Sequence, residues 1–490
     1  MNVIRKIRYP LLAVLLMTVG SMTSLLYPLH VGVDQNCFLT VAREICKGKM
    51  LYRDIFEQKG PLLYLLHLPA ALMPGLRFFG VYLVQILLWC GILYAASRLC
   101  KILMPGADEN TRFAVSAWSA LIIVTAFCYS LGDNAEELCL LPVMLSLGDL
   151  LTAAKSERLT FSRRLLLKNG VFAGCVLLIK FSMLGFYIGW CICIGLWLWR
   201  DCGFLSALRA ALCFLIGMAA VCLPFVLYFA YHHALSDAVG VYIITNATGY
   251  PRHVTLWQRI ADFFAKDILW NPVMMAAVLL GAGYTIYIGK RRERTGLLSA
   301  LCLLYLFVFI GGVRYRYYLL ILGAFVPVGV CAAMTLWGGK LRRLKKAGLV
   351  LYPVILLLAG NPSLYLTKPR AFYPQVQLAE MIEPGSVLLN YGFLDGGFWL
   401  MSGAELPTGR FFCKLNIDRA HLPEMYEAQE RCIDEREADY VVIRWEPDED
   451  PAEKYSYAPF YEHYEPVADA ENPIAGYCYR LYRRAASSEV

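Results

Sequence analysis

Charged residues are scarce in this sequence. Among its 490 residues only 17% are Asp, Glu, Lys or Arg, whereas 58% are hydrophobic and the mean hydropathy is +0.51. A soluble domain is usually about half apolar and about one quarter charged, because its surface must stay hydrated. The composition therefore excludes an ordinary soluble protein and predicts a polytopic membrane protein.

Metal-binding and disulfide patterns are missing as well. Most of the 17 cysteines lie in apolar runs, where cysteine serves as a small hydrophobic residue. No CxxC pair or Cys/His cluster has metal-site spacing, so the sequence predicts no metal ligands. The cysteines expected outside the membrane are odd in number, which disfavours a complete disulfide framework; they are Cys37, Cys46, Cys413, Cys432 and Cys478.

The few charges are unevenly distributed. Residues 363–490 contain 12 basic and 22 acidic residues, whereas residues 1–362 contain 34 basic and 16 acidic ones. Basic loops mark the cytoplasmic side of a membrane protein. We therefore expect the N-terminus in the cytoplasm and the acidic C-terminal part outside the plasma membrane. Nothing in the pattern suggests binding of nucleic acid.

Apolar runs separated by basic loops predict about eleven transmembrane helices. Residues 170–199 need two of them, because one straight helix of that length would measure about 45 Å against a hydrocarbon core of about 30 Å. Both flanking loops are basic, so the two short spans should turn outside, at Lys180. The other expected spans are 10–29, 78–99, 113–131, 138–154, 212–231, 268–289, 297–312, 319–337 and 347–360.

The chain divides at its last apolar run. Residues 1–362 are the predicted all-α membrane domain, and residues 363–490 the predicted small extracytoplasmic α/β domain. In the second domain, residues 386–389, 440–443 and 477–482 have the apolar or alternating pattern of strands, and residues 423–437 that of a helix.

Residues 31–66 form a charged loop between the first two spans. Asp34 follows the first span directly, residues 35–47 have the periodicity of a surface helix, and Lys59 leads into Gly60-Pro61 and the next apolar run. Other charged residues also fall at expected outer ends of spans. Together they suit a reaction in which one group removes a proton and cations hold a leaving anion. They are Asp34, Asp54, Glu57, Lys59, Glu136, Glu137, Lys180, Arg314 and Arg316.

Several of these motifs resemble a known family. Asp34, the sequence Tyr52-x-Asp54 and the sequence Lys59-Gly60-Pro61-Leu62-x-Tyr64 are similar to the first outer loop of GT-C integral-membrane glycosyltransferases. The nearest branch is that of protein O-mannosyltransferases and the lipid A aminoarabinose transferase (glycosyltransferase family 39-like). Asn134-Ala135-Glu136-Glu137, Lys180 and the aromatic turn 314–318 fit the same pattern, so the resemblance covers residues 1–360.

The resemblance implies a reaction and its residues. A sugar moves from a polyprenyl phosphate to a hydroxyl of a glycan, lipid or protein on the outer face of the membrane, with inversion at the anomeric carbon. Asp34 is then the general base, and Lys59, Lys180 and Arg316 bind the donor phosphate. Some relatives carry an acidic residue where this chain has Gln58, which leaves a bound divalent metal open. Supporting roles fall to Asp54, Glu57, Glu136, Glu137 and Tyr318.

Structural alternatives exist for each of these residues. Asp34 could simply end a span, the lysines could reach lipid headgroups, and Glu136 and Glu137 could cap the following helix. The chain could also be a transporter or a lipid flippase, or a membrane-anchored binding protein. Transporters usually hold ionisable residues at the midplane and have repeated halves, whereas these spans are nearly free of charge and no repeat is evident.

Overall fold

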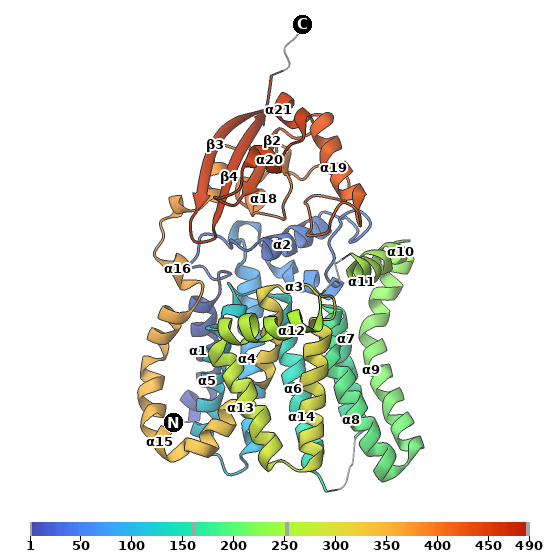
Figure 1. Ribbon diagram of the computed structural model, residues 1–490, viewed down its shortest axis with the longest axis vertical. Coiled ribbons are helices and arrows are strands. Elements are labelled where there is room, and N and C mark those ends of the chain that lie inside the picture. Colours follow the sequence, from blue (N-terminus) through green and yellow to red (C-terminus); the bar gives the residue numbers. More distant parts are fainter. Residues whose placement is uncertain (1, 158–161, 250–253, 487–490) are drawn as a thin grey trace.

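The computed structural model describes residues 2–157, 162–249 and 254–486. Helices form the lower part of the elongated molecule, and a small sheet with short helices forms the upper part, close to the C-terminus (Figure 1). The helices α2 (Val33–Cys46) and α3 (Pro61–Ala71) lie between the two parts. α2 was predicted as a surface helix, but most of its residues are buried because the C-terminal part covers it. The predicted fold class, a helical membrane region with a C-terminal α/β region, is confirmed.

The remaining helices of the lower part follow in chain order. The first are α1 (Asn2–Gly20), η1 (Pro74–Leu76), α4 (Phe79–Leu103), α5 (Glu109–Val124), η2 (Phe127–Tyr129) and α6 (Ala135–Lys155). Next come α7 (Arg163–Leu177), η3 (Phe181–Leu184), α8 (Gly185–Cys202), α9 (Phe204–Tyr231), α10 (Leu235–Ala238), η4 (Val239–Thr245), α11 (Asn246–Thr248), α12 (Leu256–Asp262) and η5 (Phe263–Ile268). The last are α13 (Pro272–Ile288), α14 (Arg291–Val308), η6 (Arg316–Phe325) and α15 (Val326–Ala359).

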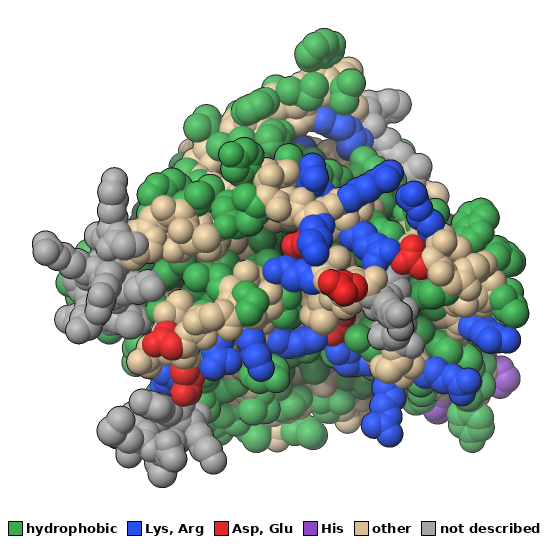
Figure 2. Space-filling model, turned by 90° about the horizontal axis from the view of Figure 1, so that it is seen from below, with side chains coloured by type: hydrophobic (Ala, Val, Ile, Leu, Met, Phe, Trp, Pro, Cys, Tyr) green, Lys and Arg blue, Asp and Glu red, His purple; other side chains and the backbone are tan. Residues whose placement is uncertain are grey.

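Within the described residues, five helices are long and apolar enough to cross a membrane. They are Phe79–Leu103, Ala135–Lys155, Phe181–Cys202, Phe204–Tyr231 and Arg316–Gly338. Other predicted spans coincide with shorter helices, such as α5 and α7 with 16 and 15 residues. The lower end of the molecule gathers Lys and Arg side chains (Figure 2), as expected where α4, α6 and α14 meet the basic loops.

The first predicted span is shorter than expected. α1 ends at Gly20, and residues 21–32 continue without regular helix, so the expected end near Leu29 is wrong. The reason is a polar contact inside the protein. The hydroxyls of Ser21 and Thr23 donate to the Gln85 side chain, and Met22 N–H donates to Leu131 O at 2.9 Å.

The predicted turn in residues 170–199 is confirmed. α7 ends at Leu177, Lys180 lies in the break, and η3 and α8 continue in a new direction. The loop that precedes α3 packs directly on this break. Gly60 N–H donates to Ile179 O at 3.1 Å, and a Cβ on Gly60 would lie 2.1 Å from Leu178 O. A glycine is therefore required where the two segments meet.

The predicted reversal between residues 337 and 347 occurs without a loop. Val326–Ala359 is a continuous helix, although the basic residues 340–346 were expected to form a turn. A straight helix of this length would measure roughly 50 Å. Yet Gly323, just before α15, packs against Ile123, and Gly20 packs against both Val124 and Leu356. Both ends therefore lie near the end of α5, so α15 must bend back within its length.

The upper part contains a four-stranded sheet in the order β1-β2-β4-β3. β1 (Leu388–Asn390) pairs parallel with β2 (Tyr440–Trp445), which pairs antiparallel with β4 (Tyr477–Arg484). These are the three predicted strands. The edge strand β3 (Tyr464–Asn472) was not predicted, because its sequence is acidic, contains Pro466 and has a register shift there. The helices of this part are α16 (Ser363–Leu366), η7 (Arg370–Phe372), α17 (Pro374–Ala379), α18 (Phe398–Ser402), α19 (Pro423–Asp434), α20 (Pro451–Lys454) and α21 (Ala458–His463).

The C-terminal part packs tightly on α2. Thr40 Oγ1 donates to Asp395 Oδ2 at 2.5 Å, and the Sγ atoms of Cys37 and Cys413 are 4.0 Å apart. Asp395 is fully buried, and burial raises its pKa to about 6, although the hydrogen bonds from Thr40 and Gly397 act to lower the pKa. Buried polar contacts of this kind fix how the C-terminal part sits over the charged loop.

These packed thiols should resist alkylation. The thiolate is the reactive form, and burial raises the pKa of both Cys37 and Cys413. We expect iodoacetamide at pH 8 to label the exposed Cys46 in the folded protein and to leave Cys37 and Cys413 unlabelled, as measured by mass spectrometry. A detergent-unfolded sample, in which all three react, is the control. Equal labelling of Cys37 and Cys46 before unfolding would show that the C-terminal part does not cover α2.

Candidate active site

Two adjoining hollows lie where the charged loop, the membrane helices and the C-terminal part meet. The first, called the Asp34 hollow, is lined by Asp34, Glu57, Gln58, Lys59, Tyr315, Tyr317, Tyr318, Leu394, Leu415 and Asn416. The second, called the lysine hollow, is lined by Gln58, Lys59, Ile179, Lys180, Phe181, Ser182, Tyr242, Asn246, Phe307, Val308, Ile310, Gly311, Val313 and Tyr318. Gln58, Lys59 and Tyr318 line both, so the two hollows are continuous. A larger hollow at the opposite end of the helices contains none of the predicted site residues.

Asp34 lies in the first turn of α2. Its side chain is within hydrogen-bonding reach of the Tyr317 hydroxyl, which comes from the start of η6. The carboxylate is half-buried, so a substrate entering the hollow can contact it. This geometry is suited to a general base.

Lys59 and Lys180 come together because the loop before α3 packs on the α7–η3 break. Lys59 Nζ lies 3.5 Å from Glu57 Oε1, and Lys180 Nζ lies 3.7 Å from the centre of the Tyr318 ring. Lys180 is also ion-paired with Glu136, at the start of α6. Burial lowers the pKa of Lys180, the Glu136 carboxylate opposes this, and the charge of Lys59 adds to the lowering. Two lysines are thus held close together beside one hollow.

Glu136 and Glu137 are neighbours in sequence but have different surroundings. Glu136 contacts Lys180 through one oxygen, while its buried Oε2 has no hydrogen-bond partner among the described residues. Glu137 lines neither hollow and accepts from Trp89 Nε1 at 2.6 Å, Gln85 Nε2 at 3.0 Å and Tyr129 Oη at 3.0 Å. Glu136 is therefore linked to the site through Lys180, whereas Glu137 joins α4, η2 and α6.

Two other predicted site residues lie outside the hollows. Asp54 is ion-paired with Arg53 at 2.8 Å on the surface and accepts from Met50 N–H at 2.9 Å. Arg316 is exposed and donates to Ser130 Oγ at 2.6 Å. It lines a neighbouring hollow with Asp267 and Arg314, which are ion-paired at 2.6 Å. Tyr315 lines this hollow as well as the Asp34 hollow, so Arg316 is adjacent to the site rather than in it.

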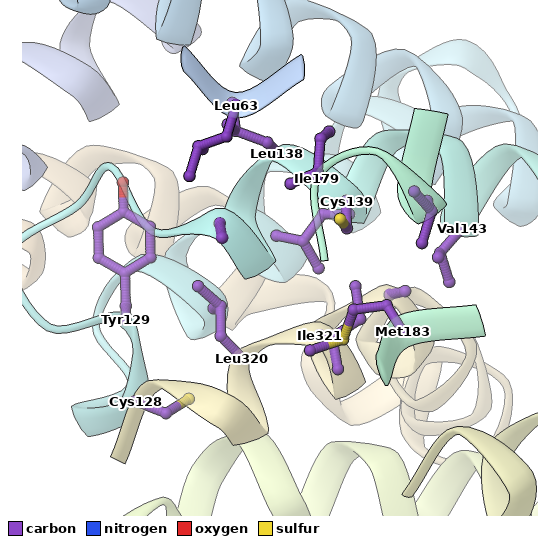
Figure 3. Close-up of a cluster of buried hydrophobic side chains, with 14 of the residues drawn as sticks. Leu63, Cys128, Tyr129, Leu138, Cys139, Val143, Ile179, Met183, Leu320 and Ile321 are labelled. Atoms are coloured by element: carbon purple, nitrogen blue, oxygen red, sulfur yellow. The ribbon is translucent and has the colours of Figure 1, made fainter. Parts of the chain in front are cut away.

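Buried apolar side chains form a cluster between the segments that carry the site residues (Figure 3). Its residues come from α3, η2, α6, the α7–η3 break and η6, the same segments that carry or adjoin the charged groups. Leu138 follows Glu136 by two residues, Ile179 precedes Lys180, and Leu320 follows Tyr318 by two residues. All three side chains are buried. A closely packed core of this kind holds the neighbouring charged side chains in place.

Sequence reasoning missed several residues that line the hollows. Tyr315 and Tyr317 belong to an aromatic run that is visible in the sequence, but the run 314–318 by itself predicts only a turn. Leu394, Leu415 and Asn416 had no local signal, because they reach Asp34 only through the packing of the C-terminal part on α2. Tyr242 and Asn246 come from η4 and α11, and Asn246 Nδ2 donates to Gln58 O at 2.6 Å.

The site does not fit a divalent metal. Among the residues that the structure describes, no group of three or more His, Cys, Asp and Glu side chains could hold a metal ion. Two carboxylates reach the Asp34 hollow, and one of them, Glu57, already accepts from Tyr64 Oη and Lys59 N–H. Divalent cations such as Mg²⁺ and Ca²⁺ prefer several oxygen ligands.

Solved structures share this architecture. ArnT from Cupriavidus metallidurans bound to undecaprenyl phosphate superposes with a TM-score of 0.63 over 98% of this chain and 97% of its own, at 13% sequence identity. The chain has the GT-C fold. The apo structure of the same ArnT matches with a TM-score of 0.60 and 14% identity, over 96% of each chain. No protein-family model and no curated protein matches the sequence. The match includes both the membrane helices and the C-terminal part, so the whole chain follows the GT-C architecture of ArnT.

Proposed function

We propose that this chain is an inverting glycosyltransferase that moves a sugar from a polyprenyl-phosphate donor to an acceptor hydroxyl. One observation carries the proposal: Asp34 and Lys59 of the charged loop 31–66 and Lys180 of the α7–η3 break surround two continuous hollows. The GT-C fold supports it, since the ArnT structure with that fold contains undecaprenyl phosphate. A carboxylate beside a pair of cations is the arrangement that such a transfer needs.

The chemistry divides between the two hollows. The Asp34 carboxylate accepts the proton of the acceptor hydroxyl while its oxygen attacks the anomeric carbon. The bond from that carbon to the phosphate oxygen breaks, and polyprenyl phosphate leaves with the bonding electrons. Lys59 and Lys180 stabilise the charge on the leaving phosphate, which can lower the barrier by about 3 kcal/mol.

The prenyl tail has a matching groove. Residues of α7, α9 and η4 line an apolar groove that shares Tyr242 with the lysine hollow. A phosphate between Lys59 and Lys180 would therefore lie at the end of this apolar groove, which runs along Phe225 and Phe229. This arrangement suits a lipid that has an anionic head group and enters from the bilayer.

We place the reaction at the outer face of the plasma membrane, in the modification of the cell envelope. The basic lower end of the molecule (Figure 2) then faces the cytoplasm, and the N-terminus is marked on the same lower half in Figure 1, in agreement with the positive-inside rule. The hollows and the C-terminal part lie at the other end. Residues 363–490 form the extracytoplasmic domain in this proposal, and residues 1–362 the membrane domain.

A donor panel tests the proposal. Vesicles containing the purified protein are mixed with polyprenyl phosphates that carry different sugars, and with cell-envelope membranes as a source of acceptors. We expect one class of donor to be consumed, with release of free polyprenyl phosphate measured by mass spectrometry. Empty vesicles are the control. If every donor stays intact but crosses the bilayer faster than in empty vesicles, the protein is a flippase and the proposal is wrong.

A further inference from the structure

The two hollows differ in charge. The described residues lining the lysine hollow include Lys59 and Lys180 and no carboxylate. The Asp34 hollow has two carboxylates, Asp34 and Glu57, and its one lysine in the described chain, Lys59, is paired with Glu57. The lining of the lysine hollow thus carries two positive charges, whose ion-pair partners Glu57 and Glu136 lie outside that lining, whereas the lining of the Asp34 hollow carries one net negative charge. The acceptor must reach Asp34, so it must enter the Asp34 hollow, whose net negative charge disfavours anions.

Tyrosine rings form one wall of the Asp34 hollow. The rings of Tyr315 and Tyr317 are nearly parallel, with an interplanar angle of 5° and centroids 5.7 Å apart, and Tyr318 stands at 74° to Tyr315. The negative face of an aromatic ring attracts the polarised C–H groups of a sugar. The Tyr317 hydroxyl is hydrogen-bonded to the Asp34 carboxylate, so an acceptor that contacts this wall also lies next to the carboxylate.

The C-terminal part supplies a further part of the lining. Asn416 Nδ2 donates to Tyr315 Oη at 3.2 Å, and Leu394 and Leu415 lie beside it. Asn416 is exposed, so its amide is accessible to a ligand that fills the hollow. An amide is uncharged and can both donate to and accept from a hydroxyl group.

We propose that the Asp34 hollow, with a volume of about 20 Å³, receives the accepting hydroxyl of an uncharged polyhydroxy acceptor such as a sugar residue, and that Asn416 at its rim selects this acceptor. This inference rests on the proposed glycosyltransferase function. It gives the C-terminal part a direct role in acceptor choice, because its loop closes the hollow beside the base. A phosphate or carboxylate next to the accepting hydroxyl is disfavoured by Asp34 and Glu57.

Matched acceptors test the inference once a donor is known. The panel contains a neutral glycan and the same glycan with a phosphate next to the accepting hydroxyl. We expect the wild-type protein to have the higher kcat/KM for the neutral glycan. In Asn416→Ala, the acceptor KM should rise by about three- to tenfold through the lost hydrogen bond, with donor KM unchanged. Asn416→Lys adds a cation to the lining and should shift the preference toward the phosphorylated glycan.

Two controls keep the outcomes distinct. Glu427→Gln lies on α19, lines neither hollow and should match the wild-type protein for both acceptors. Tyr315→Phe keeps the ring but removes the hydroxyl that holds Asn416, and should raise the acceptor KM less than Tyr315→Ala. If no donor is turned over by the wild-type protein, the proposed function fails. If transfer proceeds but the phosphorylated glycan is preferred, or Asn416→Ala leaves the acceptor KM unchanged, this inference is overturned.

Discussion

Replacing Asp34 by Asn is expected to abolish sugar transfer while the protein folds normally. Asn has the size of Asp and can still bond with the Tyr317 hydroxyl, but it cannot accept the acceptor's proton. Loss of a general base usually lowers the rate by about a hundred- to ten-thousandfold. The fall should appear in kcat, with little change in the KM for the donor, since the lysines that bind its phosphate are untouched.

A second carboxylate in the same loop provides the comparison. Asp54→Asn changes a residue that is ion-paired with Arg53 on the surface and lines neither hollow. We expect it to retain most of the transfer activity. Asp54→Asn should unfold within about 0.5 kcal/mol of the wild-type protein, as is usual for surface substitutions. Asp34→Asn should also remain folded, because Asn keeps the hydrogen bond to Tyr317. Equal turnover by Asp34→Asn and the wild-type protein would remove Asp34 from the mechanism.

The Lys180 variant is expected to lose both stability and donor binding. Lys180→Met leaves the Glu136 carboxylate fully buried without its partner, and breaking a buried ion pair typically costs about 3–5 kcal/mol. The thermal midpoint in detergent should therefore fall clearly. Loss of one of the two cations beside the lysine hollow should also raise the KM for the donor.

A double variant separates these two effects. In Lys180→Met with Glu136→Gln, no buried charge is left unpaired, so the thermal midpoint should recover most of the loss. Donor binding should stay weak, because the cation is still missing. If the double variant regains normal transfer, Lys180 only stabilises Glu136 and has no role toward the donor. If Lys180→Met alone keeps its midpoint, the ion pair contributes little to folding.

Features that depend on local length and charge could be predicted from the sequence. The apolar runs and basic loops indicated the helical membrane region, and the length of residues 170–199 located the break at Lys180. Three strands of the sheet and the helix α19 followed from their local patterns. Asp34, Lys59 and Lys180 were predicted to converge, and the structure brings them around continuous hollows.

Contacts between distant segments were decided by the tertiary structure. The sequence alone could not tell that Ser21 and Thr23 end α1 by bonding to Gln85, or that α15 reverses without a loop. Glu136 and Glu137 look alike in sequence, yet a rotation of one residue along α6 points them at Lys180 and at Trp89. Asn416 meets Tyr315 only through folding, 101 positions apart in the chain. Patterns of hydropathy and charge in the sequence indicate the structure of local segments. A binding site depends instead on which distant side chains the packed core brings together.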